Sequence, residues 1–388
     1  LGLVLALRHG PPTAVLALGG GFIAPLVAGY DAAGIGPLLV YLALFTAALF
    51  GLAVHRGWTW LAIAATAAGF AWVNFLLFAL GAGELTAPAA FVVLLAIGAS
   101  LVLPRAGVIE TWLRLAPMVA GLVQLLAFAP PLVFSAPAWG FYLTLAAASL
   151  ILARQNAIYQ PAALAALALT LLLLAIGLAE PDARTTHIAA VASAMLFAVP
   201  ALLLLHRARV WAVLALGGIG GPVFLANAVS WPRLDDWQWA IIELPAAALA
   251  GWVSWRRRSH TGERDPGLIG GAALAATLAG AALGQLAGNN WIAIPFAIIA
   301  LALGEWARQT GDAQLRLIPA FTQVLFPGFS KIKSDLDRVA VAYCRGLKVM
   351  SAAILPIVAA VIACPPAAVP LLFASQWRDA VPLIQILS

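Results

Sequence analysis

Polar side chains inside long apolar runs are the first candidates for chemistry in this chain. Glu243 is the acidic residue in the core of such a run, two residues before Pro245. Charged side chains buried in a bilayer are costly and mark ion or substrate pathways, so a proton-coupled transporter would use such a carboxylate. The alternative is that Glu243 reaches the outer interface near Trp237 and Trp239. Its shallow depth favours this second interpretation.

Four amide side chains occur in similar apolar runs, namely Asn74, Gln124, Asn227 and Gln285. They are candidates for a translocation site, Asn74 and Asn227 above all. The alternative is that they form hydrogen bonds between helices, which contribute about 0.6–2 kcal/mol each in membranes. We favour the hydrogen bonds.

A short internal repeat supplies the second set of candidates. The string AVLALGG occurs at 14–20 and again at 212–218, and a proline follows each copy. Glycine and proline are expected to interrupt both helices, and paired interruptions of this kind point to transporter binding sites. The alternative, which we favour, is that the glycines let neighbouring helices approach closely. The candidate translocation or packing residues are Gly19, Gly20, Pro25, Gly217, Gly218 and Pro222.

Carboxylates in the expected outer loops could serve a membrane glycosyltransferase, because hard cations bind carboxylate oxygens. The best pair is Asp235 and Asp236, beside Arg233. However, these loops are short, and no phosphate-binding loop or nucleophile elbow accompanies them. The two cysteines, Cys344 and Cys364, form no metal-ligand cluster. We therefore expect no enzymatic activity, no metal and no cofactor.

The composition of the chain indicates which elements position these residues. Of the 388 residues, 64% are hydrophobic and 9% are charged. A soluble domain has about 25% charged residues, so a water-soluble globule is excluded. The apolar runs are continuous, which excludes a transmembrane β-barrel. At about 20 residues per span, the apolar content predicts an all-α, polytopic transmembrane helix bundle of about twelve spans.

Loop charges predict the topology of these spans. Every other loop is basic and none of the intervening loops is, so the basic loops are expected to be cytoplasmic. The intervening outer loops include the stretch 288–290, Gly-Asn-Asn. The predicted spans are 13–29, 36–54, 58–80, 87–103, 113–129, 138–153, 161–178, 188–205, 211–229, 239–255, 268–286 and 291–304.

The net charge of +6 also bears on partners and location. In a membrane protein it reflects basic loops that face anionic lipid, so we expect the bilayer as partner and no nucleic acid. The expected location is the bacterial cytoplasmic (inner) membrane. The sequence leaves the oligomeric state open.

Residue usage changes near residue 310. All three lysines and both cysteines lie after this point, whereas thirteen of the fourteen tryptophans lie before it. We therefore expect a multi-span membrane domain at 1–310, a cytoplasmic loop with an amphipathic helix at 311–348, and a C-terminal transmembrane segment at 349–388.

The first of these domains resembles a known family. The stretch RHGPPTAVLALGGGFIAPLVAG at 8–29 and the loop HRGWTWLA at 55–62 are similar to a bacterial family catalogued as domain of unknown function 2339. The similarity extends over about residues 1–305. It implies a large multi-span architecture and supplies no chemistry.

The C-terminal stretch, residues 315–388, resembles the oligosaccharide flippases of the polysaccharide-export superfamily. Such flippases arrange two helix bundles around a central cavity, and the resemblance implies a lipid-linked glycan as partner. The residues upstream do not follow the pattern of the first bundle. The matching residues are Phe326, Pro327, Phe329, Ser330, Asp335, Tyr343, Pro356, Phe373, Gln376 and Trp377.

Three functions are compatible with these patterns. The first is a non-enzymatic inner-membrane protein with a transporter-like or scaffolding role in the cell envelope. The second is a lipid-linked oligosaccharide flippase, which rests on the C-terminal resemblance. The third is a membrane glycosyltransferase that uses the outer-loop carboxylates.

Overall fold

A computed structural model describes residues 2–30, 34–81, 84–180, 183–229, 234–258, 265–291 and 293–310 of the chain. The chain divides into two compact units, Leu1–Leu315 and Arg316–Ser388, and all described residues belong to the first. The expected amphipathic helix and the C-terminal transmembrane segment lie outside the described residues.

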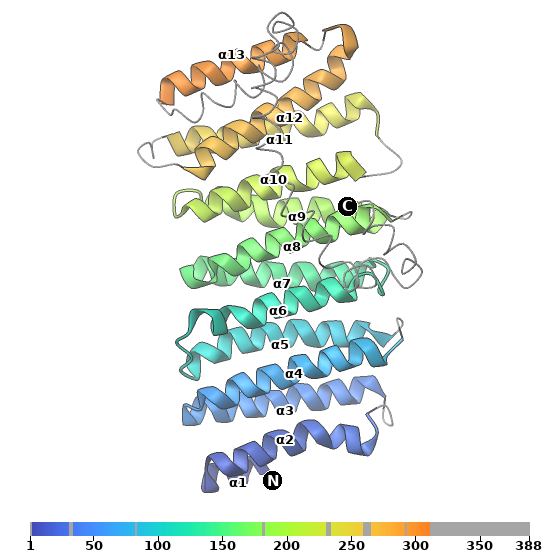
Figure 1. Ribbon diagram of the computed structural model, residues 1–388, viewed down its shortest axis with the longest axis vertical. Coiled ribbons are helices and arrows are strands. Elements are labelled where there is room, and N and C mark those ends of the chain that lie inside the picture. The colour runs from blue at the N-terminus through green and yellow to red at the C-terminus, as the bar shows by residue number, and fades with distance from the viewer. Residues whose placement is uncertain are drawn as a thin grey trace, which may run out of the picture. The chain divides into compact units, whose positions relative to one another are not determined.

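The described part of the chain consists of helices and short connections, with no strand. Most helices have the length of a single membrane crossing (Figure 1). The elements are α1 (Gly2–His9), α2 (Pro11–Ala28), α3 (Ile35–Arg56), α4 (Thr59–Ala79), α5 (Thr86–Arg105), α6 (Thr111–Phe128), α7 (Ala136–Gln155), the 3₁₀ turn η2 (Ala157–Tyr159), α8 (Gln160–Leu178), α9 (Arg184–Leu203), α10 (Arg209–Val229), α11 (Asp236–Arg257), α12 (Pro266–Trp291) and α13 (Ala293–Thr310).

The all-α, multi-pass prediction is confirmed. Each of the twelve predicted spans coincides with one of the helices α2 to α13, and ten helices in the described part are long and apolar enough to cross a membrane. Helices α11 and α13 are not among these ten. One boundary was wrong, because the predicted outer loop at 288–290 belongs to α12, which continues to Trp291. Glycine and asparagine favour turns but do not end a helix by themselves.

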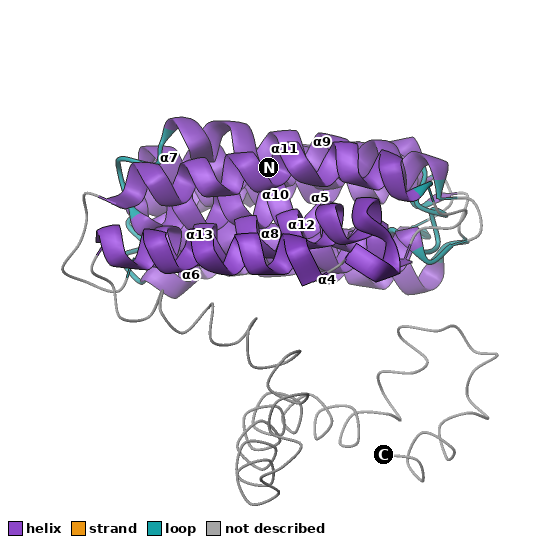
Figure 2. Cartoon of the chain, turned by 90° about the horizontal axis from the view of Figure 1, so that it is seen from above, coloured by secondary structure: helices purple, strands orange, loops and turns teal. Residues whose placement is uncertain are grey.

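The helices of the first unit pack in chain order. Each helix contacts the next one, and most also contact the next but one, such as α4 with α6, α6 with α8, and α10 with α12. Successive helices are antiparallel, and their contacts with both the next helix and the next but one produce two layers, which Figure 2 shows from above. Apart from marginal contacts, the described helices meet no helix more distant in the chain than the next but one. This connectivity differs from two bundles around a central cavity.

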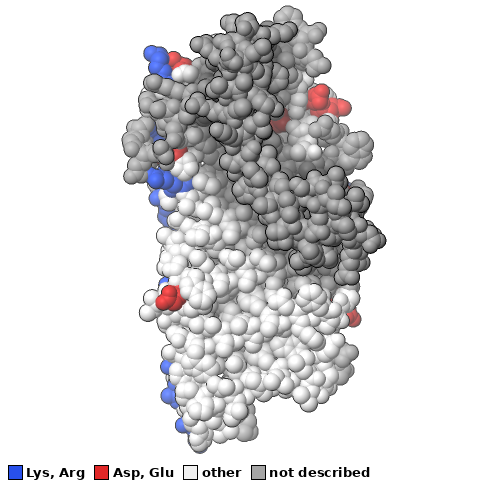
Figure 3. Space-filling model, viewed as in Figure 1, with Lys and Arg blue, Asp and Glu red and all other residues white. Residues whose placement is uncertain are grey.

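The antiparallel order gathers the basic side chains at one end of the helices. The C-terminal ends of α3, α5, α7 and α11 carry arginine in their last turns, and the turn after α9 also contains arginine. Figure 3 shows basic side chains along one edge of the visible face. Cations at these positions also interact favourably with the helix dipole.

Candidate functional site

Glu243 lies on the side of α11 that is buried within the protein. Its exposed fraction is 2%, and Trp239 and Ala247, one helical turn before and after it, are also buried. Glu243 stands seven residues into α11, about 10 Å along the helix axis from its start. The carboxylate therefore packs between helices, and its depth relative to the outer interface stays a prediction. Depth along a helix was visible in the sequence, but the neighbouring helices that cover this face were not.

Two amide side chains from neighbouring helices surround the carboxylate. Asn227, near the C-terminal end of α10, donates a hydrogen bond from Nδ2 to Glu243 Oε1 at 2.6 Å. The side chain of Gln285 on α12 also faces Glu243. Helices α10, α11 and α12 contact one another, so the cluster sits where three helices meet. We call Glu243, Asn227 and Gln285 the carboxyl–amide cluster.

The cluster contains buried oxygens without hydrogen-bond partners. Glu243 Oε2 and Gln285 Oε1 both lack a partner, and so does the buried indole Nε1 of Trp239, which lies one turn from Glu243 on α11. Buried polar atoms in native proteins are nearly always hydrogen-bonded, so unpaired atoms in one neighbourhood require an explanation. A proton on Glu243 Oε2 would turn that oxygen into a donor and would account for the two oxygens, though not for the indole N–H.

No positive side chain compensates Glu243 in the described part of the chain. The ion pairs found there join Arg257 to Asp265 and Arg308 to Glu305. A buried carboxylate without a cation is costly, and it ordinarily becomes neutral by binding a proton. The arrangement is therefore chemically suited to binding and releasing a positive charge.

The other two amides, Asn74 and Gln124, do not belong to this cluster. Both donate to the carbonyl oxygen of Phe70, each at 3.1 Å. Gln124 does so from α6, so it links α6 to α4 as expected. Asn74 lies on α4 itself, four residues after Phe70, and its side chain is exposed, so it forms no helix-to-helix bond there.

The glycine and proline repeat does not interrupt the helices. Helices α2 and α10 both run continuously through their copies, with Pro25 and Pro222 inside them. The expected helix breaks were therefore wrong, because a single proline removes only one backbone donor and a helix can continue through it.

The two copies of the repeat have different surroundings. A side chain at Gly217 or Gly218 in α10 would collide with neighbouring helices, at Leu167 and at the backbone of Ala198 respectively. These glycines allow close packing, as we favoured. Gly19 and Gly20 in α2 face open space instead.

The outer carboxylates that the structure describes do not form a metal-binding group. Asp235 precedes the first turn of α11, and its backbone N–H donates to Oε1 of Gln238 at 3.0 Å, which belongs to helix capping. The described ranges contain no group of three or more His, Cys, Asp or Glu that could hold a metal ion. The neighbouring Arg233 lies outside the described residues.

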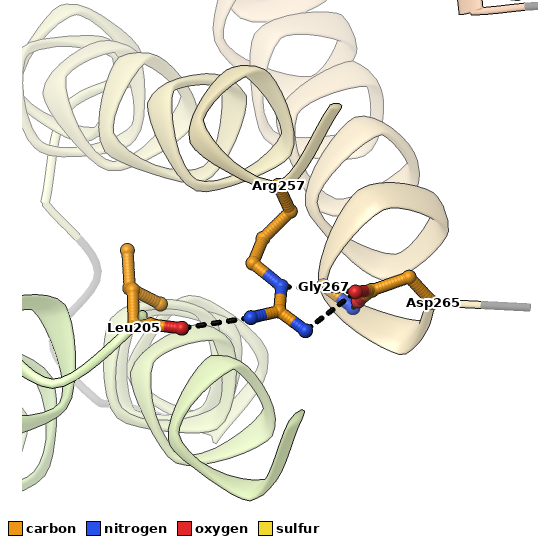
Figure 4. A network of polar contacts seen from close by, with 4 residues as sticks. All are labelled: Leu205, Arg257, Asp265 and Gly267. Carbon is orange, nitrogen blue, oxygen red and sulfur yellow. Dashed lines mark hydrogen bonds and ion pairs between the residues drawn. The ribbon is translucent and has the colours of Figure 1, made fainter. Parts of the chain in front are cut away.

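Sequence reasoning missed a buried polar network at the other end of α11. Arg257 donates from Nε and Nη2 to Asp265 Oδ2, at 2.9 and 2.5 Å, and from Nη1 to the carbonyl oxygen of Leu205 at 2.8 Å (Figure 4). Gly267 N–H donates to Asp265 Oδ1 at 2.7 Å. A signal was present, since Asp265 directly before Pro266 is typical of a helix start. We call these contacts the arginine clamp.

The flippase-like residues of the C-terminal stretch lie outside the described residues. These are Phe326, Pro327, Phe329, Ser330, Asp335, Tyr343, Pro356, Phe373, Gln376 and Trp377.

Comparisons with known proteins agree with both resemblances. The lipopolysaccharide biosynthesis protein WzxC of Escherichia coli (strain K12) is 32% identical over 73 residues. This match spans 19% of the chain and 15% of WzxC, and it fits the flippase resemblance. No solved structure matches the chain. The family described as predicted membrane protein (DUF2339) matches residues 1–388, so its match continues beyond the region that the sequence patterns indicated. The chain therefore belongs to the DUF2339 family of membrane proteins.

Proposed function

We propose that this chain is a non-enzymatic, transporter-like protein of the bacterial cytoplasmic membrane, in which Glu243 binds and releases a proton. One observation carries the proposal, namely a carboxyl group that is 2% exposed and has one oxygen without a partner. Intramembrane carboxyl groups of this kind serve as proton relays in pumps and transporters.

The hydrogen bonds around Glu243 support a proton as the species bound. Asn227 occupies Oε1, which leaves Oε2 as the position for the proton. Rotation of the Gln285 amide by half a turn would present its oxygen as an acceptor for that proton. The described neighbours that face the carboxyl from α10 and α12 are the amides of Asn227 and Gln285, which do not titrate. Glu243 is therefore the group that changes charge.

Proton binding at Glu243 would change the hydrogen bonds between helices α10, α11 and α12. The charged form attracts the amide N–H groups of α10 and α12, whereas the neutral form can itself donate a hydrogen bond. Each form favours a different set of contacts among α10, α11 and α12. Coupling between a proton and a transported substrate requires a two-state element of this type.

The test is infrared difference spectroscopy of the whole chain in lipid nanodiscs during a pH titration. We expect the carbonyl band of a neutral carboxylic acid in the native protein and its loss in Glu243→Gln. Glu84→Gln is the matched control, because Glu84 is exposed and this change should leave the band intact. An unchanged band in Glu243→Gln would refute proton binding at this residue.

The match to WzxC favours a second candidate, a flippase for lipid-linked oligosaccharides. A flippase mutant should accumulate lipid-linked glycan on the cytoplasmic face of the membrane. We expect no such accumulation in cells that lack this protein, because the helices in the described part follow one another in two layers and do not form two bundles. Accumulation that is reversed by the native chain would instead favour the flippase.

A further inference from the structure

The end of α11 that carries the arginine clamp also presents two arginine–tryptophan pairs. The guanidinium of Arg256 lies over the ring of Trp252, with Cζ 5.3 Å from the ring centroid. That of Arg258 lies over Trp255 at 4.7 Å. Both tryptophans are exposed, by 37% and 44%. A guanidinium that stacks on an aromatic face keeps its N–H edges free to donate hydrogen bonds.

The buried Arg257 between these two pairs fixes their position. It is 4% exposed and its donors bind Asp265 and the carbonyl oxygen of Leu205, so the last turn of α11 is held against the start of α12 and the turn after α9. Residues adjacent in a helix differ by about 100° in direction. Arg256 and Arg258 therefore lie on either side of the inward-facing Arg257, and both are exposed.

This end of the molecule has a local excess of positive charge. Arg207, in the turn that the clamp holds beside α11, is also exposed. Two acids of the described residues lie near this end. Asp265 is buried and paired with Arg257. Glu305, next to the Trp306 that donates to Ser254, is paired with Arg308. The exposed arginines Arg207, Arg256 and Arg258 take part in none of the ion pairs found in the described part.

We propose that this surface binds the phosphate headgroups of anionic phospholipids, with Arg256 and Arg258 as the phosphate ligands and Trp252 and Trp255 against the adjacent lipid. Guanidinium groups bind phosphate through paired hydrogen bonds. Tryptophan occupies the level of the headgroups at a membrane interface. Loop charges predict that this end faces the cytoplasm, where anionic lipids attract arginine. The occupant is a membrane lipid rather than a free phosphate, because the cations are joined to exposed indole rings at the end of the predicted span 239–255.

The test measures lipid binding to the purified full chain by native mass spectrometry, with phosphatidylglycerol and with phosphatidylcholine as probes. We expect preferential binding of phosphatidylglycerol, and roughly 30-fold weaker binding in the double variant Arg256→Gln, Arg258→Gln, since each arginine near a lipid surface contributes about a factor of five. Arg256→Lys, Arg258→Lys should retain much of the preference.

The matched control is Arg105→Gln combined with Arg154→Gln, which removes two exposed arginines at the same end of other helices. Arg105 donates to its own helix at the carbonyl of Leu101, and neither residue is stacked on a tryptophan in the described structure. This control should bind phosphatidylglycerol like the native chain. If both double variants lost lipid binding equally, any pair of exposed arginines would serve as well as Arg256 and Arg258, and the proposal would be overturned. So would unaltered binding in the α11 variant, or displacement of the lipid by inorganic phosphate.

Discussion

At the scale of single residues, the two charged groups buried in α11 have opposite surroundings. Arg257 donates hydrogen bonds to a carboxylate and to a backbone carbonyl, whereas Glu243 is surrounded by amides and one of its oxygens has no hydrogen-bond partner. Removing one partner of a buried ion pair leaves an uncompensated charge and destabilises the structure, whereas an unsatisfied carboxyl is available for a change of charge. On our proposal, stability and proton binding are therefore assigned to different turns of the same helix.

Removing one partner of the clamp should destabilise the protein more than removing both. We expect Asp265→Asn to lower the free energy of unfolding by about 3 kcal/mol, because Arg257 would remain buried without its counter-charge. The double variant Arg257→Met, Asp265→Asn should recover part of this loss. Thermal unfolding of the purified full chain in detergent measures both. A single variant that melts like the native chain would contradict a structural role for the clamp.

At the scale of helices, the repeated string AVLALGG offers an internal comparison. Gly218 in α10 has the backbone nitrogen of Ala198 only 2.8 Å from where a Cβ would stand, whereas Gly20 in α2 has nothing within 4 Å. We expect Gly218→Ala to lower the melting temperature because α9 and α10 must separate. Gly20→Ala should leave it unchanged or raise it, since alanine favours a helix by about 1 kcal/mol over glycine. Equal effects in the two copies would show that close packing at Gly218 contributes nothing.

The two copies of this string also show which features of the helices the sequence predicts and which it does not. Helix positions followed from apolar runs of about 20 residues, and each predicted span coincides with a helix. Packing partners did not follow, because Ala, Leu and Gly cover all sides of these helices and no single side is distinguished. For this reason identical strings have different surroundings, and the burial of Glu243 depended on helices that its own segment does not specify.

At the scale of the whole molecule, topology is the prediction most open to a direct test. The alternation of loop charge predicts that the C-terminal ends of α3, α5, α7 and α11 face the cytoplasm. A reporter at Arg257 would disrupt the buried clamp, so the structure directs the test to exposed positions. Arg154, near the end of α7, and Glu180, after α8, are both exposed and lie at opposite ends of these helices.

We expect Glu180→Cys to react with a membrane-impermeant thiol reagent in intact spheroplasts, and Arg154→Cys to react only after the membrane is opened. Both changes are made in a chain in which Cys344 and Cys364 are replaced by serine, because these are the two native thiols. The reverse pattern would invert the orientation of every helix. It would also place the arginine–tryptophan pairs of α11 at the outer leaflet. The same labelling experiment therefore tests both the topology and the side of the membrane on which the proposed lipid site lies. Proton binding at Glu243 does not depend on its result.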